Sequence, residues 1–237
     1  MQHNDTPQLP LPLLPRIQLG WNNFVVGNNE IVVNSVRELN TAHASAKSIY
    51  IAGPSGAGKS HLLFAVLNQL IEASEQSTVQ YLDLQQAGSD YQSIAHIQPK
   101  AINLLDNVDS LAGDAESERA LFGLIERIRQ SESMFIATAK TGLEHSSFEL
   151  IDLVSRLQAG LYYSLREMDD EQTQKAIALR FKTMGLAVSD AITHYILTRL
   201  PRNKHELFAA LDDLDEAALK AQRKITIPFI RATLHVR

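Results

Sequence analysis

Gly53-Pro54-Ser55-Gly56-Ala57-Gly58-Lys59-Ser60 fits the pattern G-x-x-x-x-G-K-[ST] of a phosphate-binding loop, and the rest of the chain is arranged around it. Its glycines allow successive backbone N–H groups to point into one concavity, and the helix that follows adds its positive N-terminal end. We therefore expect Lys59 to reach the β- and γ-phosphates of a nucleotide and Ser60 to ligate Mg²⁺. His61 follows directly and is expected to belong to the same site.

The segments on both sides of this loop support the assignment. Ser48-Ile49-Tyr50-Ile51-Ala52 is mostly apolar, as expected of a buried strand. A flexible glycine-rich turn is the alternative, but it does not explain why a strand precedes the loop and a helix follows it. After Lys59, apolar side chains recur at the spacing of a helix, at Leu62, Leu63, Val66, Leu67, Leu70 and Ile71.

The composition indicates a globular protein with one main domain and a smaller appendage. The chain has 237 residues, of which 45% are hydrophobic and 21% charged, and no apolar run approaches the length of a membrane helix. It lacks cysteine, which excludes a disulfide framework, a cysteine-based zinc site and a cysteine nucleophile, and favours the cytoplasm. A net charge of −5 argues against a general nucleic-acid surface.

Strand and helix patterns alternate through the first two thirds of the chain. We predict strands over residues 48–52, 79–84, 101–106, 134–138 and 161–165, and helices over 31–39, 59–71, 116–130 and 150–157. This alternation implies an α/β fold in which a five-stranded parallel sheet is covered by helices on both faces.

The third predicted strand ends in a carboxylate. An apolar strand that ends in aspartate, here Asp106, downstream of a phosphate-binding loop is the Walker B arrangement, in which the carboxylate holds Mg²⁺ directly or through water. The next residue, where many ATPases have a glutamate that polarises water, is Asn107, and an amide cannot accept a proton. Asp109 would lie on the face of Asn107 if the strand continued. It is therefore either a substitute base or a surface or capping aspartate.

Beyond Arg166 the pattern is purely helical. Four helices are predicted, with start signals at residues 169–172, 189, 203–206 and 226–228. We therefore divide the chain into an extended tail over 1–20, an α/β domain over 21–166 and a four-helix domain over 167–237. Basic residues near the end form a solvated helix face or, alternatively, a DNA-binding tail; they are Lys220, Arg223, Lys224, Arg231 and Arg237.

Two segments ahead of the phosphate-binding loop each have two interpretations. Pro7-Gln8-Leu9-Pro10-Leu11-Pro12-Leu13-Leu14-Pro15 has prolines that forbid a helix and a central strand, so it is a stiff spacer or a peptide that docks on a partner. It lacks the cationic start and the cleavage site of a signal peptide. Trp21 and Phe24 either flank a nucleotide base or staple the start of the following helix.

Several motifs resemble the DnaA/Hda family of the AAA+ superfamily, from about Asn22 to the end of the chain. Phe24-Val25-Val26-Gly27-Asn28-Asn29 is similar to the segment that borders the adenine in bacterial initiators of the DnaA type. Gln8-Leu9-Pro10-Leu11-Pro12-Leu13 resembles the family's motif for the sliding clamp. Four further segments resemble the small DnaA-homologous regulators of this family: Asp106-Asn107, Ala112-Gly113-Asp114, Ser155-Arg156-Leu157 and Ala221-Gln222-Arg223-Lys224-Ile225-Thr226-Ile227-Pro228-Phe229.

The resemblance implies an AAA+ fold with a small C-terminal helical lid and a bound nucleotide. That nucleotide would be ADP, or another nucleoside diphosphate, with Mg²⁺ at Ser60 and Asp106. At sensor 2, where initiators carry an arginine that touches the nucleotide, this chain has His205, with Arg202 as the neighbouring cation. The implied contacts outside the phosphate-binding loop are His61, Phe24, Val25, Val26, Asp106, His205 and Arg202.

The resemblance also implies two protein partners. Gln8, Leu9, Leu11 and Leu13 are implied to bind the sliding clamp, the β subunit of DNA polymerase III. Arg156 is implied to be an arginine finger acting in the ATP site of a DnaA initiator, whereas the alternative is a structural arginine paired with Asp152. DNA would be contacted mainly through the clamp, a homo-oligomer is left open, and no membrane is involved.

The family's function would then be regulatory. A clamp-bound, nucleotide-bound protein would stimulate hydrolysis of the ATP held by DnaA and prevent re-initiation of chromosomal replication, without being an efficient ATPase itself. One rival is an autonomous AAA+ ATPase that acts as a motor or replication loader, which would usually have an acid at position 107. Another is a DNA-binding accessory factor, which would need a basic surface. Because the chain ends where an initiator continues into a helix-turn-helix domain, autonomous origin recognition is not expected.

Overall fold

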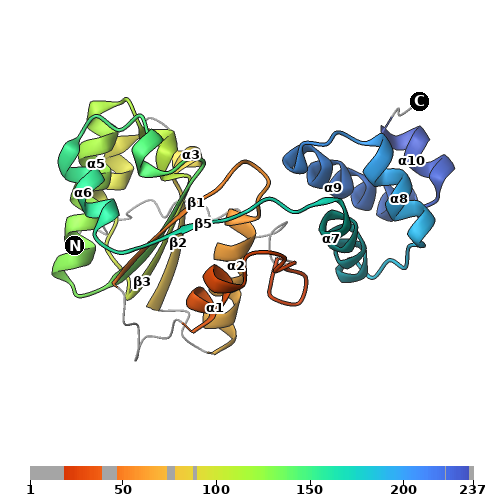
Figure 1. The fold of residues 1–237 in the computed structure, drawn as a ribbon, viewed down its shortest axis with the longest axis horizontal. Helices are drawn as coiled ribbons and strands as arrows, with labels where there is room; N and C mark the ends of the chain where they lie inside the picture. The colour runs from red at the N-terminus through yellow and green to blue at the C-terminus, as the bar shows by residue number, and fades with distance from the viewer. Residues whose placement is uncertain (1–18, 39–46, 74–77, 88–89, 222, 235–237) are drawn as a thin grey trace, which may run out of the picture.

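The computed structural model describes residues 19–38, 47–73, 78–87, 90–221 and 223–234. These residues form a parallel sheet in the order β2-β3-β4-β1-β5 and two groups of helices (Figure 1). The five predicted strands are confirmed, each to within one residue at either end. They are β1 (Ser48–Ala52), β2 (Val79–Asp83), β3 (Ile102–Asp106), β4 (Met134–Ala139) and β5 (Leu161–Ser164).

Six helices accompany the sheet in the described residues. They are α1 (Glu30–Arg37), α2 (Lys59–Glu72), α3 (Leu84–Ala87), α4 (Tyr91–His96), α5 (Ala115–Gln130) and α6 (Ile151–Gln158). The four that the apolar periodicity predicted are confirmed, although α1 ends at Arg37 and the predicted last residue, Leu39, lies outside the described residues. Helices α3 and α4 were not predicted, because helices of four and six residues are too short to show a clear period.

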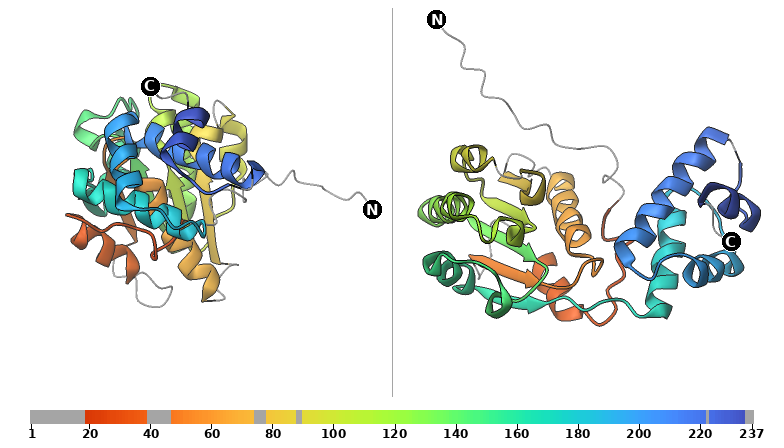
Figure 2. Two further views of the ribbon diagram at one scale, coloured as in Figure 1. Left: turned by 90° about the vertical axis from the view of Figure 1, so that its right-hand side faces the viewer. Right: turned by 90° about the horizontal axis from the view of Figure 1, so that it is seen from above.

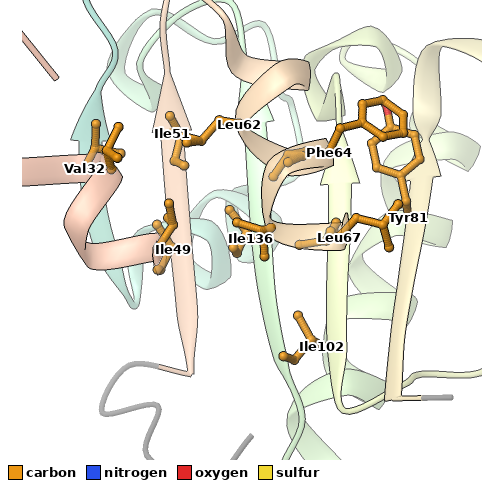
Figure 3. Packing of buried hydrophobic residues seen from close by; sticks show 14 of the residues in the cluster. Val32, Ile49, Ile51, Leu62, Phe64, Leu67, Tyr81, Ile102 and Ile136 are labelled. Carbon is orange, nitrogen blue, oxygen red and sulfur yellow. The ribbon is translucent and has the colours of Figure 1, made fainter. Parts of the chain in front are cut away.

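Alternate residues of β1 face opposite sides of the sheet. Ile49 and Ile51 pack against α1 and α2, in a buried cluster that includes Val32, Leu62 and Ile136 (Figure 3). Tyr50 and Ala52 belong to a second cluster with side chains of α5 and α6, which lie on the other side of the sheet (Figure 1). This period of two, with both faces buried, is what a parallel sheet between helical layers requires.

The last four helices form a separate group, as predicted. They are α7 (Asp170–Thr183), α8 (Asp190–Arg199), α9 (Lys204–Ala221) and α10 (Ile227–Leu234). They enclose a third buried cluster, centred on Ile177, Phe181 and Leu211. Figures 1 and 2 show this group, the lid, beside the sheet and joined to it by the chain that leaves β5. The boundary at residues 166 and 167 stays a prediction.

The lid helices begin largely as the sequence indicates. The capping box at Asp169 is confirmed, because its carboxylate accepts the N–H of Gln172 at 2.8 Å and the Gln172 side chain accepts the N–H of Asp169. Ser189 is the N-cap residue of α8, as predicted, although its side chain makes no capping hydrogen bond. Its backbone carbonyl sets the first turn instead, since it accepts the N–H groups of Ile192 and Thr193. Across the described ranges, no helix combines the length and apolarity needed to cross a bilayer.

Candidate nucleotide-binding site

The phosphate-binding loop joins the end of β1 to the start of α2, as predicted. Gly56 and Gly58 have φ values of 82° and 97°, a backbone region that side-chain-bearing residues rarely adopt. A Cβ on Gly53 would lie 2.8 Å from the carbonyl oxygen of Leu165, so the loop also needs a glycine where it passes the chain leaving β5. The two left-handed glycines turn the loop into α2, whose first residue is Lys59.

Lys59 is folded back onto its own loop. Its Nζ donates to the carbonyl oxygens of Gly53 at 2.6 Å and Pro54 at 2.9 Å, and the residue is only 7% exposed. Burial lowers the pKa of this ammonium, and the negative charge of Asp106 opposes the decrease. A donor satisfied by weakly basic backbone carbonyls can be transferred to phosphate oxygens, which bind an ammonium more strongly.

Asp106 lies at the end of β3 and is fully buried. The Tyr81 hydroxyl donates to Oδ2 at 2.7 Å, and the Thr138 hydroxyl donates to Oδ1. Each carboxylate oxygen thus has one donor but keeps a second lone pair. A Mg²⁺ ion at this site would therefore be contacted by Asp106 through water, and Ser60 stays the predicted direct ligand. Among the described residues, no cluster of three or more His, Cys, Asp or Glu side chains could hold a metal ion by itself.

Asn107 follows the Walker B strand in a left-handed conformation, with φ 57°. Its N–H donates to Thr138 Oγ1 at 3.2 Å, and its side-chain amide donates to Asp83 Oδ1 at 3.1 Å. The strand therefore does not continue, and a 3-10 turn over Val108–Leu111 follows. The arrangement that would have placed Asp109 on the face of Asn107 is absent, which removes the basis for Asp109 as a substitute base.

A pocket of about 590 Å³ opens between the phosphate-binding loop, the ends of the strands, the segment around Phe24 and the lid. Of the predicted contacts outside the loop, Phe24, Val25, His61 and His205 line it. Three others do not: Val26 packs against the core, Asp106 is buried beneath, and Arg202 is exposed. Residues that the sequence analysis did not assign to the nucleotide also line the pocket: Asn23, Asp83, Asn107, Lys140, Met168, Arg180, Lys204, Phe208 and Asp212.

The two aromatic residues ahead of α1 have different places. Phe24 lies edge-on to His61, with 5.0 Å between ring centroids, and lines the pocket. Trp21 instead ties this segment to the helices: its Nε1 donates to Gln69 at 2.6 Å, and the guanidinium of Arg37 lies 4.5 Å from its ring centroid. The structure thus fits the pocket interpretation for Phe24. For Trp21 it fits neither, because Trp21 does not line the pocket and its partners are the last residue of α1 and a residue of α2, not the start of α1.

His61 is a half-buried, neutral hydrogen-bond donor. Its Nε2 lies 3.1 Å from both the Gly20 carbonyl oxygen and Asn23 Oδ1, so the proton is on Nε2. Burial lowers its pKa to about 4, and the positive charge of Arg180 contributes to the decrease. His61 therefore holds the segment ahead of α1 against the start of α2, where it shapes one wall of the pocket.

The lid reaches the phosphate-binding loop through the start of α9. Asn203 Oδ1 accepts the N–H groups of His205 and Glu206, as the predicted cap requires. A Cβ on Gly56 would lie 2.4 Å from the Cβ of Lys204, so the two segments touch. The structure thus brings His205 and Lys204 to the loop and leaves Arg202 outside. Lys204 could have been suspected, because it adjoins the predicted sensor-2 position.

Arg156 lies apart from this pocket, on α6. Its Nε pairs with Glu126 Oε1 of α5 at 2.5 Å, so the pairing with Asp152 that was considered from the sequence is not the one formed. Glu126 also pairs with Arg129, and these two cations lower the pKa of its carboxyl. The Arg156 side chain remains 40% exposed beside this ion pair. The predicted clamp motif over residues 8–13 lies outside the described residues.

Comparisons with known proteins agree with the fold and the loop. A family model described as the bacterial DnaA ATPase domain matches residues 16–164, and one described as the Hda lid domain matches residues 170–234. An uncharacterized protein of Haemophilus influenzae is 36% identical over 233 residues, which cover 97% of this chain and 99% of the relative.

Two solved structures show the same fold at low sequence identity. Domain III of the Thermotoga maritima replication initiation protein DnaA is 20% identical, with a TM-score of 0.77 over 95% of this chain and 98% of that one. The replication initiator DnaA bound to AMPPCP and single-stranded DNA is 22% identical, with a TM-score of 0.66 over 86% and 68%.

Proposed function

Because the chain belongs to the bacterial DnaA ATPase-domain family and is an Hda-like AAA+ protein within it, we propose that it inactivates the DnaA initiator. In this proposal the protein is loaded with a nucleotide and bound to the sliding clamp of the replicative polymerase. It stimulates hydrolysis of the ATP that the initiator holds. The initiator is thereby converted to its diphosphate form, and chromosomal replication does not start again.

One observation carries the proposal: the chain separates its nucleotide pocket from its finger candidate. The pocket has the loop and Lys59, but an amide, Asn107, stands where a water-polarising acid is usual. Arg156 is on α6, is not among the pocket-lining residues, and remains partly exposed. This separation is expected of a protein whose own nucleotide has a structural role and whose arginine enters the ATP site of a neighbouring protein.

The nucleotide is proposed to be ADP with Mg²⁺. Backbone N–H groups of the loop and the start of α2 would hold its phosphates, and Lys59 would leave the Gly53 and Pro54 carbonyls to contact them. Ser60 would ligate the metal, and Asp106 would hold a metal-bound water. A diphosphate is proposed because the amide of Asn107 cannot act as a base, so the bound nucleotide would have a structural role and would not be turned over efficiently.

Arg156 would act by charge. A guanidinium that enters the initiator's site neutralises charge on the transferring phosphoryl oxygens, an effect worth roughly 10³ to 10⁵ in rate in other phosphoryl-transfer systems. To do so, Arg156 must exchange Glu126 for phosphate oxygens. Glu126 keeps Arg129 as a partner, so the exchange does not strand an unpaired carboxylate.

The clamp is proposed to bind residues 8–13, with Gln8 at the rim of a hydrophobic pocket and Leu9, Leu11 and Leu13 as apolar contacts. DNA is proposed to be reached mainly through the clamp, and a homo-oligomer remains compatible with this assignment. Direct DNA binding is not proposed, because the chain carries a net charge of −5.

A reconstituted reaction tests the function. Initiator is loaded with radiolabelled ATP and mixed with DNA, clamp and this protein, and labelled diphosphate on the initiator is counted over time. The proposal expects faster conversion only when clamp, DNA and this protein are all present. Equal rates with and without this protein would contradict the proposal. Stimulation without the clamp would contradict the clamp part of the proposal and leave only the contact with the initiator.

A further inference from the structure

The segment over residues 20–29, here called the strap, lies between the sheet domain and α7 of the lid (Figure 1). Among the described residues, no helix of the lid packs extensively on a helix or strand of the sheet domain, and the lid has a buried cluster of its own. The strap contributes Asn23, Phe24 and Val25 to the lining of the nucleotide pocket. The position of the lid over this pocket therefore depends on what the strap contacts.

One side of the strap is fixed to the sheet domain. Phe24 is 8% exposed and packs in the buried cluster beneath α1 and α2, where Val26 joins it. The Nε2 of His61, on α2, lies 3.1 Å from the Gly20 carbonyl oxygen, and Trp21 Nε1 donates to a side chain of the same helix. The strap is thus a fixed part of the sheet domain.

The end of the strap holds the chain that leaves β5. The carboxamide of Asn29, which is 6% exposed, pairs with both backbone polar groups of Arg166: Nδ2 donates to the carbonyl oxygen at 3.1 Å, and the N–H donates to Oδ1 at 2.8 Å. Asn29 is also the N-cap residue of α1, but its side chain makes no capping hydrogen bond. This side chain therefore serves the connection to the lid and not the start of α1.

The strap also contacts α7 near both of its ends. Near the start, the side chain of Gln172 lies against Gly27, where a Cβ would come within 2.8 Å of Oε1. At the end, Thr183 Oγ1 accepts a hydrogen bond from Asn23 Nδ2 at 3.2 Å. Gln172 and Thr183 are separated by a rise of roughly 16 Å along the helix. Contacts at these two points and at Arg166 restrict rotation of the lid about its connection.

We infer that the strap holds the lid in one position over the phosphate-binding loop whether or not a nucleotide is bound, and that Asn29 is the positioning residue. The close approach of Lys204 to Gly56 belongs to this position. A pocket whose walls are already in place binds a ligand without the cost of ordering them. This inference goes beyond the proposed function, and only its measurements with ADP rest on the nucleotide proposed there.

Distances between spin labels in the full chain test the inference. Because the chain lacks cysteine, Gln130→Cys on α5 and Arg199→Cys on α8, two exposed positions, give one label in each part. Double electron–electron resonance should show one narrow distance distribution, and saturating ADP should shift its mean by no more than about 2 Å. Adding Asn29→Ala should broaden the distribution without nucleotide. Saturating ADP should narrow it again, because a ligand selects the lid position that it contacts.

The affinity for ADP is the second measurement. A lid that occupies the binding position for about a tenth of the time would weaken ADP binding about tenfold, and we expect a loss of this size in Asn29→Ala. Asn28→Ala is the matched control, because it truncates the exposed neighbour of Asn29, and it should keep both the narrow distribution and the affinity. Thr183→Val removes the acceptor at the other end of α7 and should also broaden the distribution, so the test does not depend on Asn29→Ala alone.

A larger shift of the mean distance when ADP is added would overturn the inference, since the nucleotide would then set the lid position. So would distributions in Asn29→Ala and Thr183→Val that are as narrow as in the labelled protein without these substitutions. A lowered thermal midpoint of Asn29→Ala with unchanged distances would leave Asn29 only a structural role and overturn its positioning role. Failure to bind ADP would contradict the proposed nucleotide, whereas the distances measured without nucleotide would still decide whether the strap holds the lid.

Discussion

His61, in the wall of the nucleotide pocket, makes the stability of the fold depend on pH. Its pKa is lowered to about 4 by burial, from an ordinary value of about 6.5 in the unfolded chain. Between these values the unfolded state binds a proton that the folded state does not, so stability falls as pH falls below about 6.5. The loss due to this residue reaches about 2 kcal/mol at pH 5 and would stop growing below pH 4.

We therefore expect His61→Gln to be less sensitive to acid than the wild type. Glutamine keeps an N–H donor for Gly20 and Asn23 but does not titrate. Free energies of unfolding from urea titrations at pH 7.5 and pH 5 are the measurement. Acidification should cost the variant about 2 kcal/mol less than the wild type. An identical acid sensitivity in both proteins would mean that His61 is not held neutral by the fold.

Residues that belong to a local pattern could be predicted, and those defined by contacts across the fold could not. Lys59, Ser60 and Asp106 follow from a loop motif and the end of an apolar strand. Arg180, which lines the pocket, has no such signal, because it meets Asp212 only where α7 packs beside α9. The end of the strand at Asp106 was predicted, but the left-handed conformation of Asn107 was not, because its side chain is held by Asp83 of another strand.

Helix α6, which carries the finger candidate, is fixed to α5 by a buried carboxylate. Glu118 is 1% exposed, and its oxygens accept the N–H groups of Gly113, Glu149 and Leu150. The last two N–H groups precede the first turn of α6, so one side chain anchors both the turn before α5 and the start of α6.

Glu118→Gln should loosen this anchor. The amide has one acceptor oxygen in place of two and adds an NH₂ group that faces donors, so we expect a loss of about 1 to 3 kcal/mol in the free energy of unfolding. Glu116→Gln is the matched control, because Glu116 is an exposed carboxylate on the same helix, paired with Arg119. Urea titration compares the two variants. Equal stabilities would show that the three N–H groups do not depend on the Glu118 charge.

At the level of helices and strands, periodicity predicted what is long or buried. Strands β1 to β4 and the long helices α2, α5 and α7 bury apolar side chains, whereas the edge strand β5 is largely exposed. The short helices α3 and α4 depend on their place beside β3 and α5 for stability. The order of the strands and the contact of α9 with the phosphate-binding loop are products of tertiary packing, which a local pattern does not contain.

The nucleotide pocket is shared between the sheet domain and the lid, so a bound nucleotide should stabilise the whole molecule. At a hundredfold excess over its dissociation constant, ADP should add about 2.7 kcal/mol to the free energy of unfolding. Lys59→Ala should remove most of this gain, because Lys59 supplies the loop's cation, which would contact the phosphates. Thermal denaturation with and without ADP measures it. Rapid ATP turnover by the isolated protein, lost in Lys59→Ala, would instead support the autonomous ATPase.

The proposed clamp contact lies in the tail and should be separable from folding. Substituting Gln8 and Leu11 with alanine is expected to weaken clamp binding by more than about tenfold and to leave the thermal midpoint unchanged. The readout is the affinity for purified clamp, measured by titrating the clamp over the immobilised protein. Substituting Gln2 and Asn4 is the matched control, since these polar residues precede the motif. Unchanged affinity in the double variant would make the tail a spacer.

The role of Arg156 in the complete assembly is tested by comparing two arginines that share Glu126. Arg156→Ala and Arg129→Ala each remove one partner of this carboxylate, from α6 and α5 respectively. Each variant is added with clamp and DNA to initiator loaded with labelled ATP, and the single-turnover rate of hydrolysis is measured. Arg156→Ala should lose about 10³-fold or more of the stimulation, whereas Arg129→Ala should stimulate as the wild type does. Full stimulation by Arg156→Ala, or an equal loss in both variants, would contradict an arginine finger at this position.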